Sequence, residues 1–331
     1  MLGFVVAGAL LVAGAVLLTV GAEAFAEHAG AASARLGVSV FALALLLAGA
    51  EPEEAVTAMV ASGQSHPALA AGDAIGANLV ILSLTLGLAA LVTPLPVSRR
   101  VAEYAAASAV LGAVAVALAW NGVLGRWDGL ILVVLYAGGV GWVWRREHEP
   151  PAVGELAEME LDDDHAHQVH DQVHDQERNR TGEDTGRPLL LVLLGVLGMV
   201  AGGYLAVRGA EGLVGLFHAD ESVIGLTVLA LATSAEMLAL VFAAARRGTS
   251  EIVVAGTVGS VGYNATVTLG LAALVNPLLI GRHNPVLLVG VLVAVLPLVL
   301  LLGLRTGALP RLLGLPLVAV YVLVVWRLFA G

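Results

Sequence analysis

Cysteine and lysine are both absent from this sequence of 331 residues, and charged residues of any kind are scarce. Without cysteine the chain has no disulfide, no thiolate metal site and no cysteine nucleophile. Without lysine it has no Schiff-base catalyst. Charged residues make up 13% of the chain, whereas 59% are hydrophobic. A composition this apolar is atypical of water-soluble domains and indicates an integral membrane protein.

Ten stretches of the sequence are apolar enough to cross a bilayer, which takes roughly 20 residues of α-helix. Five precede and five follow a polar segment at 147–187, so we predict an all-α polytopic membrane protein with about ten transmembrane helices. The predicted spans are 3–22, 37–62, 71–93, 101–121, 127–145, 188–208, 222–246, 252–275, 284–304 and 309–329.

Arginine is distributed unevenly between the loops on the two sides of the membrane. Twelve arginines fall on the side of the polar segment and four on the other. Because Arg-rich loops stay in the cytoplasm, residues 147–187 are predicted to be cytoplasmic and both termini to lie outside. The expected location is the plasma membrane.

The two halves of the chain repeat each other. The sequence LGLAALVTP at 86–94 recurs as LGLAALVNP at 269–277, which is an offset of 183 residues. Each half holds an odd number of spans, so the second copy must be inverted in the membrane. The predicted domains are an inverted repeat at 1–146, the loop at 147–187 and a second inverted repeat at 188–331. Such repeats are typical of secondary transporters, whose substrate site lies where the copies meet.

Glutamates lie in the middle of two predicted spans, where a carboxylate costs several kcal/mol and therefore indicates a functional site. Glu51, Glu53 and Glu54 lie in the first copy and Glu236 in the second. The offset of 183 pairs Glu53 with Glu236, so these two are predicted to be the central ligands, with Glu51 and Glu54 as accessory carboxylates. Four other acids near span ends are expected to be interfacial: Asp73, Glu103, Asp128 and Glu251.

Uncharged oxygen donors surround both glutamate segments. Pro52 has no N–H, so within a helix it would free the carbonyl of Ala48 for ligation. The second copy offers the hydroxyls of Thr233 and Ser234, and the carbonyl of Ala232, at the matching place. The predicted shell also includes three side chains from the third and eighth spans: Asn78, Ser260 and Asn264.

A site with two facing carboxylates, several neutral oxygens and no soft ligand suits a hard cation. Calcium fits best, since it takes six to eight oxygens and two glutamates balance its charge. The same carboxylates could carry protons instead, so that one pair of side chains would serve two competing ions.

These features resemble the cation/calcium exchangers, which are built from two inverted five-helix halves that each contain an α-repeat. The resemblance covers nearly the whole chain except the polar segment, and it is strongest at 49–57 and 232–240 and in the glycine segments downstream. The calcium/proton pattern, with Glu four residues after Gly, selects Glu53 and also Glu236, where Ala232 replaces the glycine. The sodium/calcium pattern, with Glu five residues after Gly, selects Glu54 and Met237.

The resemblance implies a secondary antiporter, not an enzyme, that exports calcium in exchange for protons or sodium by alternating access and needs no cofactor. Its partners would be the lipid bilayer and inorganic cations, with no nucleic acid. The alternatives are an antiporter of another cation, such as a sodium/proton exchanger, a cation channel or an intramembrane metal hydrolase. The spans contain no His-Glu-x-x-His motif, which disfavours the hydrolase.

The polar segment has low hydrophobicity and dense charge, which predict disorder. It holds 13 of the 26 acidic residues and three of the 16 arginines, so it accounts for the whole net charge of −10. Our preferred interpretation is a solvated linker between the halves. The alternative is a weak divalent or transition metal site formed by four histidines: His165, His167, His170 and His174.

Overall fold

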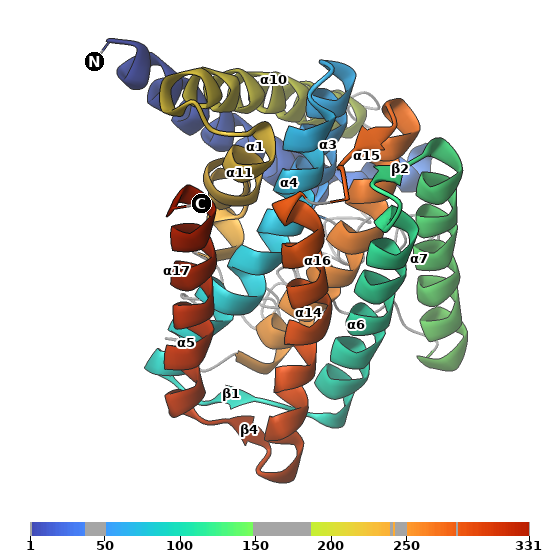
Figure 1. The fold of residues 1–331 in the computed structure, drawn as a ribbon. Coiled ribbons are helices and arrows are strands. Elements are labelled where there is room, and N and C mark those ends of the chain that lie inside the picture. Colours follow the sequence, from blue (N-terminus) through green and yellow to red (C-terminus); the bar gives the residue numbers. More distant parts are fainter. Residues whose placement is uncertain are drawn as a thin grey trace.

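The computed structural model describes residues 2–36, 51–147, 187–238, 241, 250–282 and 284–330, and most of these residues are helical (Figure 1). The elements of the first half are α1 (Leu2–Leu36), α3 (Pro52–Gly63), α4 (Pro67–Leu79), the π-helix η1 (Val80–Thr85), α5 (Leu86–Val92), β1 (Leu95–Pro96), α6 (Arg99–Ala119), β2 (Val123–Leu124) and α7 (Arg126–Glu147).

The second half begins with the long helix α10. Its elements are α10 (Arg187–Phe217), α11 (Glu221–Ile224), the π-helix η3 (Gly225–Leu229), α12 (Ala230–Thr233), α14 (Ser250–Tyr263), the π-helix η4 (Asn264–Thr268), α15 (Leu269–Val275), β3 (Leu278–Leu279), α16 (Pro285–Val295), the 3₁₀-helix η5 (Leu296–Arg305), β4 (Ala308–Leu309), the 3₁₀-helix η6 (Arg311–Leu313) and α17 (Gly314–Ala330).

Eight helical stretches among the described residues are long and apolar enough to cross a bilayer. They coincide with eight of the ten predicted spans. The other two, 37–62 and 222–246, fall partly outside the described residues, and their described parts include α3 and the apolar run Glu221–Thr233. The polytopic all-α fold is therefore confirmed.

The repeat extends to backbone detail. Helices α5 and α15 have the same sequence, LGLAALV, and begin and end 183 residues apart. Each is preceded by a π-helix, η1 in the first half and η4 in the second. Because π-helices are rare and often mark functional sites, their recurrence at equivalent positions indicates that the two halves share one geometry.

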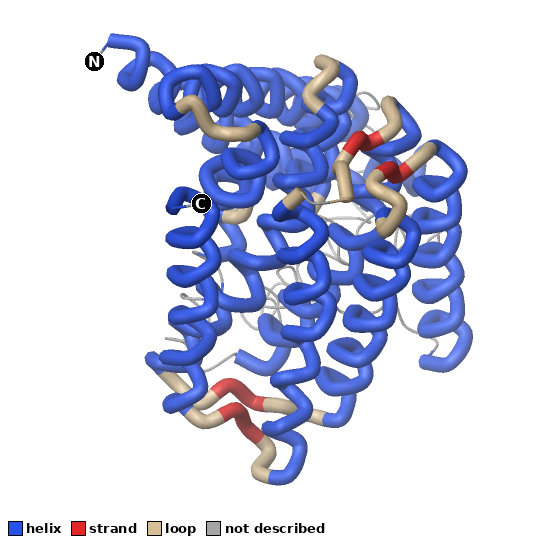
Figure 2. The backbone as a smooth tube through the Cα atoms, viewed as in Figure 1, coloured by secondary structure: helices blue, strands red, loops and turns tan. Residues whose placement is uncertain are grey.

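Two short strand pairs reveal that the halves are inverted. Strand β1 pairs with β4 and β2 pairs with β3, both antiparallel. The offset of 183 relates β1 to β3, so each pair joins one strand from each half. Figure 2 shows the two pairs at opposite ends of the helix bundle. An operation that exchanges the halves must therefore turn the molecule upside down, as the odd number of spans predicts.

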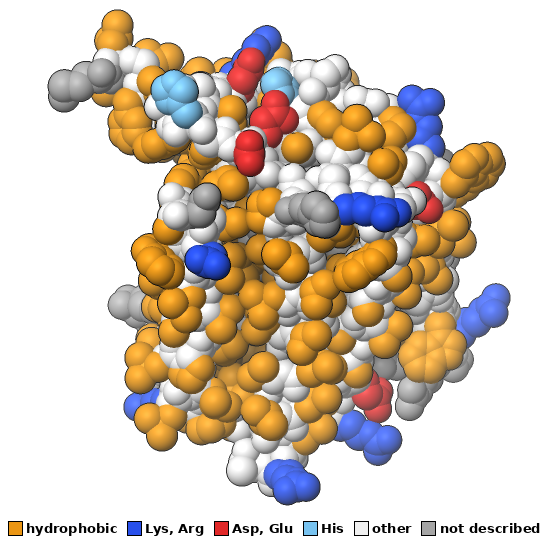
Figure 3. All heavy atoms as spheres, viewed as in Figure 1, with side chains coloured by type: hydrophobic (Ala, Val, Ile, Leu, Met, Phe, Trp, Pro, Cys, Tyr) orange, Lys and Arg blue, Asp and Glu red, His pale blue; other side chains and the backbone are white. Residues whose placement is uncertain are grey.

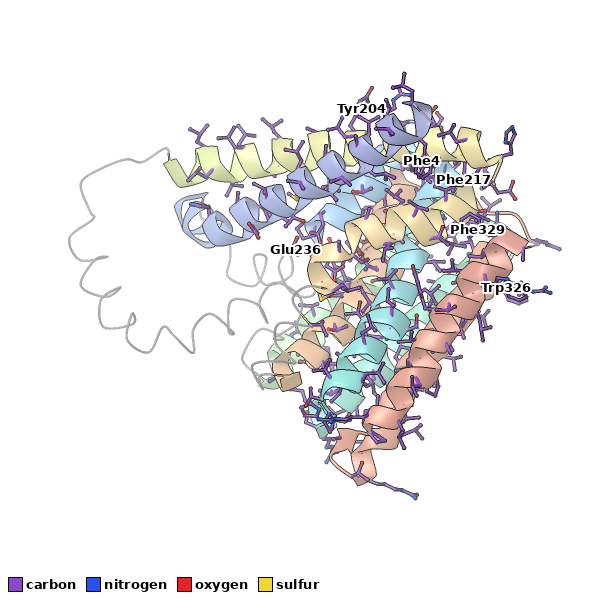
Figure 4. All side chains as sticks on the ribbon, turned by 90° about the vertical axis from the view of Figure 1, so that its left-hand side faces the viewer. Phe4, Tyr204, Phe217, Glu236, Trp326 and Phe329 are labelled. Atoms are coloured by element: carbon purple, nitrogen blue, oxygen red, sulfur yellow. The ribbon has the colours of Figure 1, made fainter. Side chains whose placement is uncertain are left out.

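Helices α1 and α10 run antiparallel and side by side across one end of the bundle (Figures 1 and 4). Glycines allow their backbones to touch. A β-carbon on Gly14 would lie 2.6 Å from the backbone nitrogen of Ala206, and one on Gly202 would lie 2.7 Å from that of Leu18. Small residues permit such close approach between membrane helices. Gly14 and Gly202 are 188 residues apart and end the repeated sequence VAG at 12–14 and 200–202, so they are equivalent positions of the two halves.

The sides of the bundle are covered by apolar side chains, and most charged side chains lie towards its two ends (Figure 3). Large hydrophobic residues are exposed on α7, including Val134 and Trp142, and on α17, including Leu323 and Trp326. A surface this apolar faces lipid rather than water. The polar groups of the interior are concentrated where α3, α4, α12 and α14 meet.

Candidate cation-binding site

The start of α3 brings three carboxylates into the protein interior. Proline begins this helix: Pro52 occupies its first turn, where the missing N–H costs nothing. Glu51 occupies the N-cap position without a side-chain capping hydrogen bond, and Glu53 and Glu54 lie in the first turn of the helix. The exposed fractions of Glu51, Glu53 and Glu54 are 4%, 6% and 0%. A helix N-terminus carries partial positive charge, which stabilises carboxylates held there.

Helix α12 ends at the position equivalent to Glu51. The chain leaves helical geometry at Ser234, which is 183 residues after Glu51, and its side chain crosses to the other half. The Ser234 hydroxyl donates to Glu54 Oε1 at 2.8 Å. Both side chains are buried. This hydrogen bond fixes the orientation of one carboxylate and ties the two glutamate segments together. Ala232 lies two residues earlier in α12 and is half-buried.

Asp73 on α4 is a fourth buried carboxylate, and the prediction that it is interfacial was wrong. Its exposed fraction is 1%, and its Oδ1 accepts a hydrogen bond from the Thr233 hydroxyl at 3.2 Å. The close packing of α4 against the second half explains the burial. A β-carbon on Gly72 would lie 2.8 Å from the carbonyl of Ser222, so the two backbones nearly touch beside Asp73.

Glu236, the carboxylate of the second half, lies beside α1 (Figure 4). It is half-buried, and its carboxylate interacts with Thr19 and Glu23 of α1 and electrostatically with Glu51. Glu51 in turn lies next to Glu54, which makes Glu51 the link between the carboxylates of the two halves. The residue that connects the two halves is thus Glu51, which the sequence ranked as accessory.

Helix α14 and the π-helix η4 complete the surroundings of Glu51 with neutral oxygens. Ser260 and Asn264 lie next to Glu51, and both are fully buried. The side-chain oxygen of Asn264 accepts a hydrogen bond from Thr268 at 2.9 Å. Asn78 donates to the backbone oxygen of Val261 at 3.0 Å. Because Asn78 and Val261 are 183 residues apart, this contact lies close to the axis that relates the halves.

Several buried oxygens in this region have no hydrogen-bond partner among the described residues. They belong to Glu51 (both oxygens), Glu54 (Oε2), Asp73 (Oδ2), Asn78 (Oδ1) and Glu236 (Oε2). A buried polar atom without a partner costs about 1–3 kcal/mol, and more when it is charged. None of the hydrogen bonds to these described side chains comes from an arginine or a histidine. The unpartnered oxygens suit a cation.

The described carboxylates do not form a ready-made cage for one ion in this conformation. No three carboxylate or imidazole groups among the described residues are close enough together to hold one ion. Neutral oxygens must therefore supply much of the coordination shell. Ala48, whose carbonyl is a predicted ligand, lies outside the described residues, as do His165, His167, His170 and His174 of the polar segment.

The sequence matches one protein family over both halves. Residues 1–145 and 187–330 fit the model of the sodium/calcium exchanger protein family. The chain belongs to this family. Inner membrane protein YrbG of Escherichia coli (strain K12) is 28% identical over 276 residues, which cover 82% of this chain and 80% of that protein. The predicted family is thus confirmed, and with it a secondary transporter rather than an enzyme.

Two solved exchangers have the same fold. The sodium/calcium exchanger from Methanococcus jannaschii is 21% identical, with 97% of this chain and 98% of that one covered and a TM-score of 0.58. The H⁺/Ca²⁺ exchanger CAX is 16% identical, with 99% and 84% covered and a TM-score of 0.68. As a member of the exchanger family, the chain is a multi-pass membrane antiporter of cations.

Most of the buried polar groups of the site were predictable from the sequence, whereas the burial of Asp73 and the part of Thr19 and Glu23 of α1 beside Glu236 were not. Glu51, Glu53, Glu54, Thr233, Ser234, Ser260, Asn78 and Asn264 are all buried. Asp73 was missed because hydropathy placed the start of the third span at residue 71, whereas α4 begins at Pro67. Two signals were available. Proline favours the first turn of a helix, and glycines at 72 and 76 indicate a tightly packed face.

Proposed function

We propose that this exchanger moves calcium out of the cytoplasm in exchange for protons or sodium by alternating access. The observation that carries the proposal is the group of unpartnered, buried carboxylate oxygens where the helix breaks at Glu51 and Ser234 meet. Calcium is bound by carboxylate, carbonyl and amide oxygens in flexible geometry, and every one of these donor types is present.

Glu53 and Glu236 are the proposed central ligands, because the repeat offset and the calcium/proton pattern both select them. Glu51 interacts with Glu54 of its own half and electrostatically with Glu236 of the other. In this conformation no three described carboxylates are close enough to hold one ion, so Glu51 would join the shell only when the helices close round the ion. Asn264 and Ser260 would supply neutral oxygens from α14 and η4. Thr233 and Ser234 would act mainly by orienting Asp73 and Glu54, to which they donate hydrogen bonds.

The number of carboxylates supports a site that serves more than one ion. Four acids from the first half and Glu236 from the second are gathered in or beside the interior. One calcium ion balances two negative charges. The remaining carboxylates therefore need protons or monovalent cations whenever the site is shut off from water, because unpaired charge in the membrane interior is costly. Exchange against protons or sodium meets that need.

Alternating access follows from the inverted repeat. Two halves with the same geometry but opposite orientation can exchange conformations, which opens the shared site first to one side and then to the other. We further propose the plasma membrane as the location, with residues 147–187 in the cytoplasm and both termini outside, on the basis of twelve arginines against four. In this proposal the two inverted repeats are residues 1–146 and 188–331, and residues 147–187 are the loop between them.

Calcium flux into proteoliposomes tests the proposed function. The purified protein is reconstituted, and uptake is driven by a proton gradient or by a sodium gradient at clamped voltage, with protein-free vesicles as the control. Uptake under either gradient supports calcium exchange and identifies the counter-ion. If neither gradient drives calcium while a proton gradient does drive sodium, the scaffold exchanges another cation and the proposal is wrong.

A further inference from the structure

A cavity of about 420 Å³ lies away from the ion site, between α6, α7 and α14. Pockets that bind drug-sized ligands have volumes of about 300–1,000 Å³, so this space can accept a substantial apolar group. Its walls are mainly small and aromatic. Gly139, Tyr136 and Trp142 come from α7, Tyr104 from α6 and Gly262 from α14.

The described rim of the cavity carries exposed apolar side chains. Trp142 at its rim is 60% exposed, and the neighbouring faces of α6 and α7 expose Val110 and Val134 to similar degrees. These side chains belong to the apolar surface that surrounds the bundle. Within the cavity, Ser108 uses its hydroxyl to donate to the backbone oxygen of Val258 at 2.7 Å, so its wall is less polar than its composition indicates.

Basic side chains gather at the end of the bundle where the cavity lies. The cavity lies one turn from the start of α6, where Arg99 and Arg100 are exposed. It also lies close to the last turn of α7, where Arg145 is exposed. Arg100 donates to the hydroxyl of Tyr104, a cavity residue, at 3.1 Å. Glu103 also lines the cavity, but Arg99 forms an ion pair with it at 3.1 Å.

We propose that this cavity binds one acyl chain of an anionic phospholipid, whose phosphate group contacts the arginines at the mouth. Arg99 is paired with Glu103, so Arg100 and Arg145 are the described arginines offered to the headgroup, and arginine binds phosphate with directional hydrogen bonds. Basic pockets between membrane helices bind anionic lipids for the same reason. A zwitterionic lipid offers the same acyl chain but no net charge for the arginines.

The lipid would contact the wall behind the ion site. Tyr136 packs edge-on against Tyr263 with ring centroids 5.5 Å apart. Both tyrosines cluster with Ala55, which follows Glu54 in α3. An acyl chain in the cavity therefore supports the aromatic pair that holds the start of α3 in place. Bound lipid should stabilise the fold even where transport is not measured.

Two adjacent glycines of α7 provide a matched test. A β-carbon at Gly138 or at Gly139 would meet no atom within 4 Å, but only Gly139 lines the cavity. Gly139→Leu should therefore fill the cavity, and Gly138→Leu should place the same side chain on the outer surface. Both variants change helix propensity alike, so any difference between them reports on the cavity.

The experiment measures lipid retained by the purified full-length protein. Each variant is incubated with phosphatidylglycerol or phosphatidylcholine of the same chain length, exchanged into detergent and examined by native mass spectrometry, and its thermal midpoint is recorded. We expect the parent protein and Gly138→Leu to retain one phosphatidylglycerol and to melt at a higher temperature with it. Gly139→Leu should lose both effects.

The headgroup is tested with Arg100→Gln, against Arg311→Gln as an exposed arginine outside the cavity lining. Arg100→Gln should reduce the preference for phosphatidylglycerol about fivefold, whereas Arg311→Gln should leave it unchanged. Equal retention by Gly139→Leu and Gly138→Leu would overturn the proposal, as would equal retention of the two lipids by the parent protein. None of these measurements depends on which ion is transported.

Discussion

The two inverted halves of this exchanger agree in backbone and differ in chemistry. Helices α5 and α15, their preceding π-helices and the two strand pairs match across the repeat. The carboxylates do not. At the positions equivalent to Glu51, Glu54 and Asp73 the second half has Ser234, Met237 and Gly256. Only Glu53 has a carboxylate partner, Glu236. The fold requires both halves to have the same shape, whereas ion binding needs only their combined oxygens.

The shared pair should give the largest effect. Glu53→Gln or Glu236→Gln removes one of the two carboxylates that both halves contribute, and the loss of a buried charge partner typically costs 2–5 kcal/mol. We expect calcium exchange to fall by about 100-fold or more, with normal membrane insertion. Flux in proteoliposomes measures the loss.

Glu211→Gln is the matched control for this pair. Glu211 is an exposed glutamate paired with Arg208 at 2.8 Å, and exposed ion pairs contribute little. Full transport by either Glu53→Gln or Glu236→Gln would disprove the assignment of the central ligands.

Exchanging the residues at the equivalent positions 51 and 234 tests whether the two halves present these positions to one ion. Glu51→Ser gives the first half the residue of the second, and we expect calcium affinity to fall by about tenfold because calcium affinity depends on ligand charge. Adding Ser234→Glu restores the number of carboxylates from the other half. If the two positions face one site, the double variant should bind calcium more tightly than Glu51→Ser alone.

Isothermal titration of the detergent-purified variants measures these affinities. Ser234→Glu by itself is the control, since it adds a carboxylate and removes the hydrogen bond to Glu54. Strictly additive effects of the two substitutions would show that positions 51 and 234 do not share an ion.

Asp73 tests a charge that only the first half carries. Asp73→Asn keeps an oxygen that can accept the hydrogen bond from Thr233 but removes the negative charge. We expect the concentration of driving ion that gives half-maximal flux to change by about two- to fivefold. The effect is modest because the fold and the hydrogen bond are kept. The thermal midpoint should remain unchanged.

A second substitution, Asp73→Ala, distinguishes the loss of charge from the loss of the hydrogen bond at this position. Asp73→Ala also removes the charge, but it leaves Thr233 without its partner on α4. Similar flux in Asp73→Asn and in the parent protein would mean that the charge of Asp73 takes no part in exchange.

The smallest effect is expected in the polar segment between the halves. Replacing His165, His167, His170 and His174 with alanine should leave calcium flux within about twofold, because a solvated linker needs no specific side chains. Flux with and without added zinc is the measurement. A larger fall, or a zinc response that disappears with the histidines, would support the metal-binding interpretation instead.

Much of the fold could be predicted because the two halves share a stretch of identical sequence. The identical stretch LGLAALV fixed the offset of 183, and that offset relates the helix breaks at Glu51 and Ser234 as well as the contact of Asn78 with Val261. Strand pairing between the halves was not predicted. Two-residue strands leave no periodic pattern, and their partners lie far apart in the sequence.

The arrangement of the carboxylates was harder to predict, because it depends on packing between helices. The depth of Asp73 follows from the helix start at Pro67 and from the close contact at Gly72. The central position of Glu51 follows from its place as the residue that caps α3, where its side chain lies near both Glu54 and Glu236. The sequence of a single span predicts neither the depth of Asp73 nor the position of Glu51, because both depend on contacts between helices.

The most direct test of the central claim is to locate the ion. Crystals of the protein soaked in strontium, a calcium substitute that scatters anomalously, would give an anomalous difference map. The account predicts a peak bounded by Glu51, Glu53, Glu236 and Asn264, which disappears when excess sodium or acid is added. A peak elsewhere in the protein, with none among these four side chains, would contradict it.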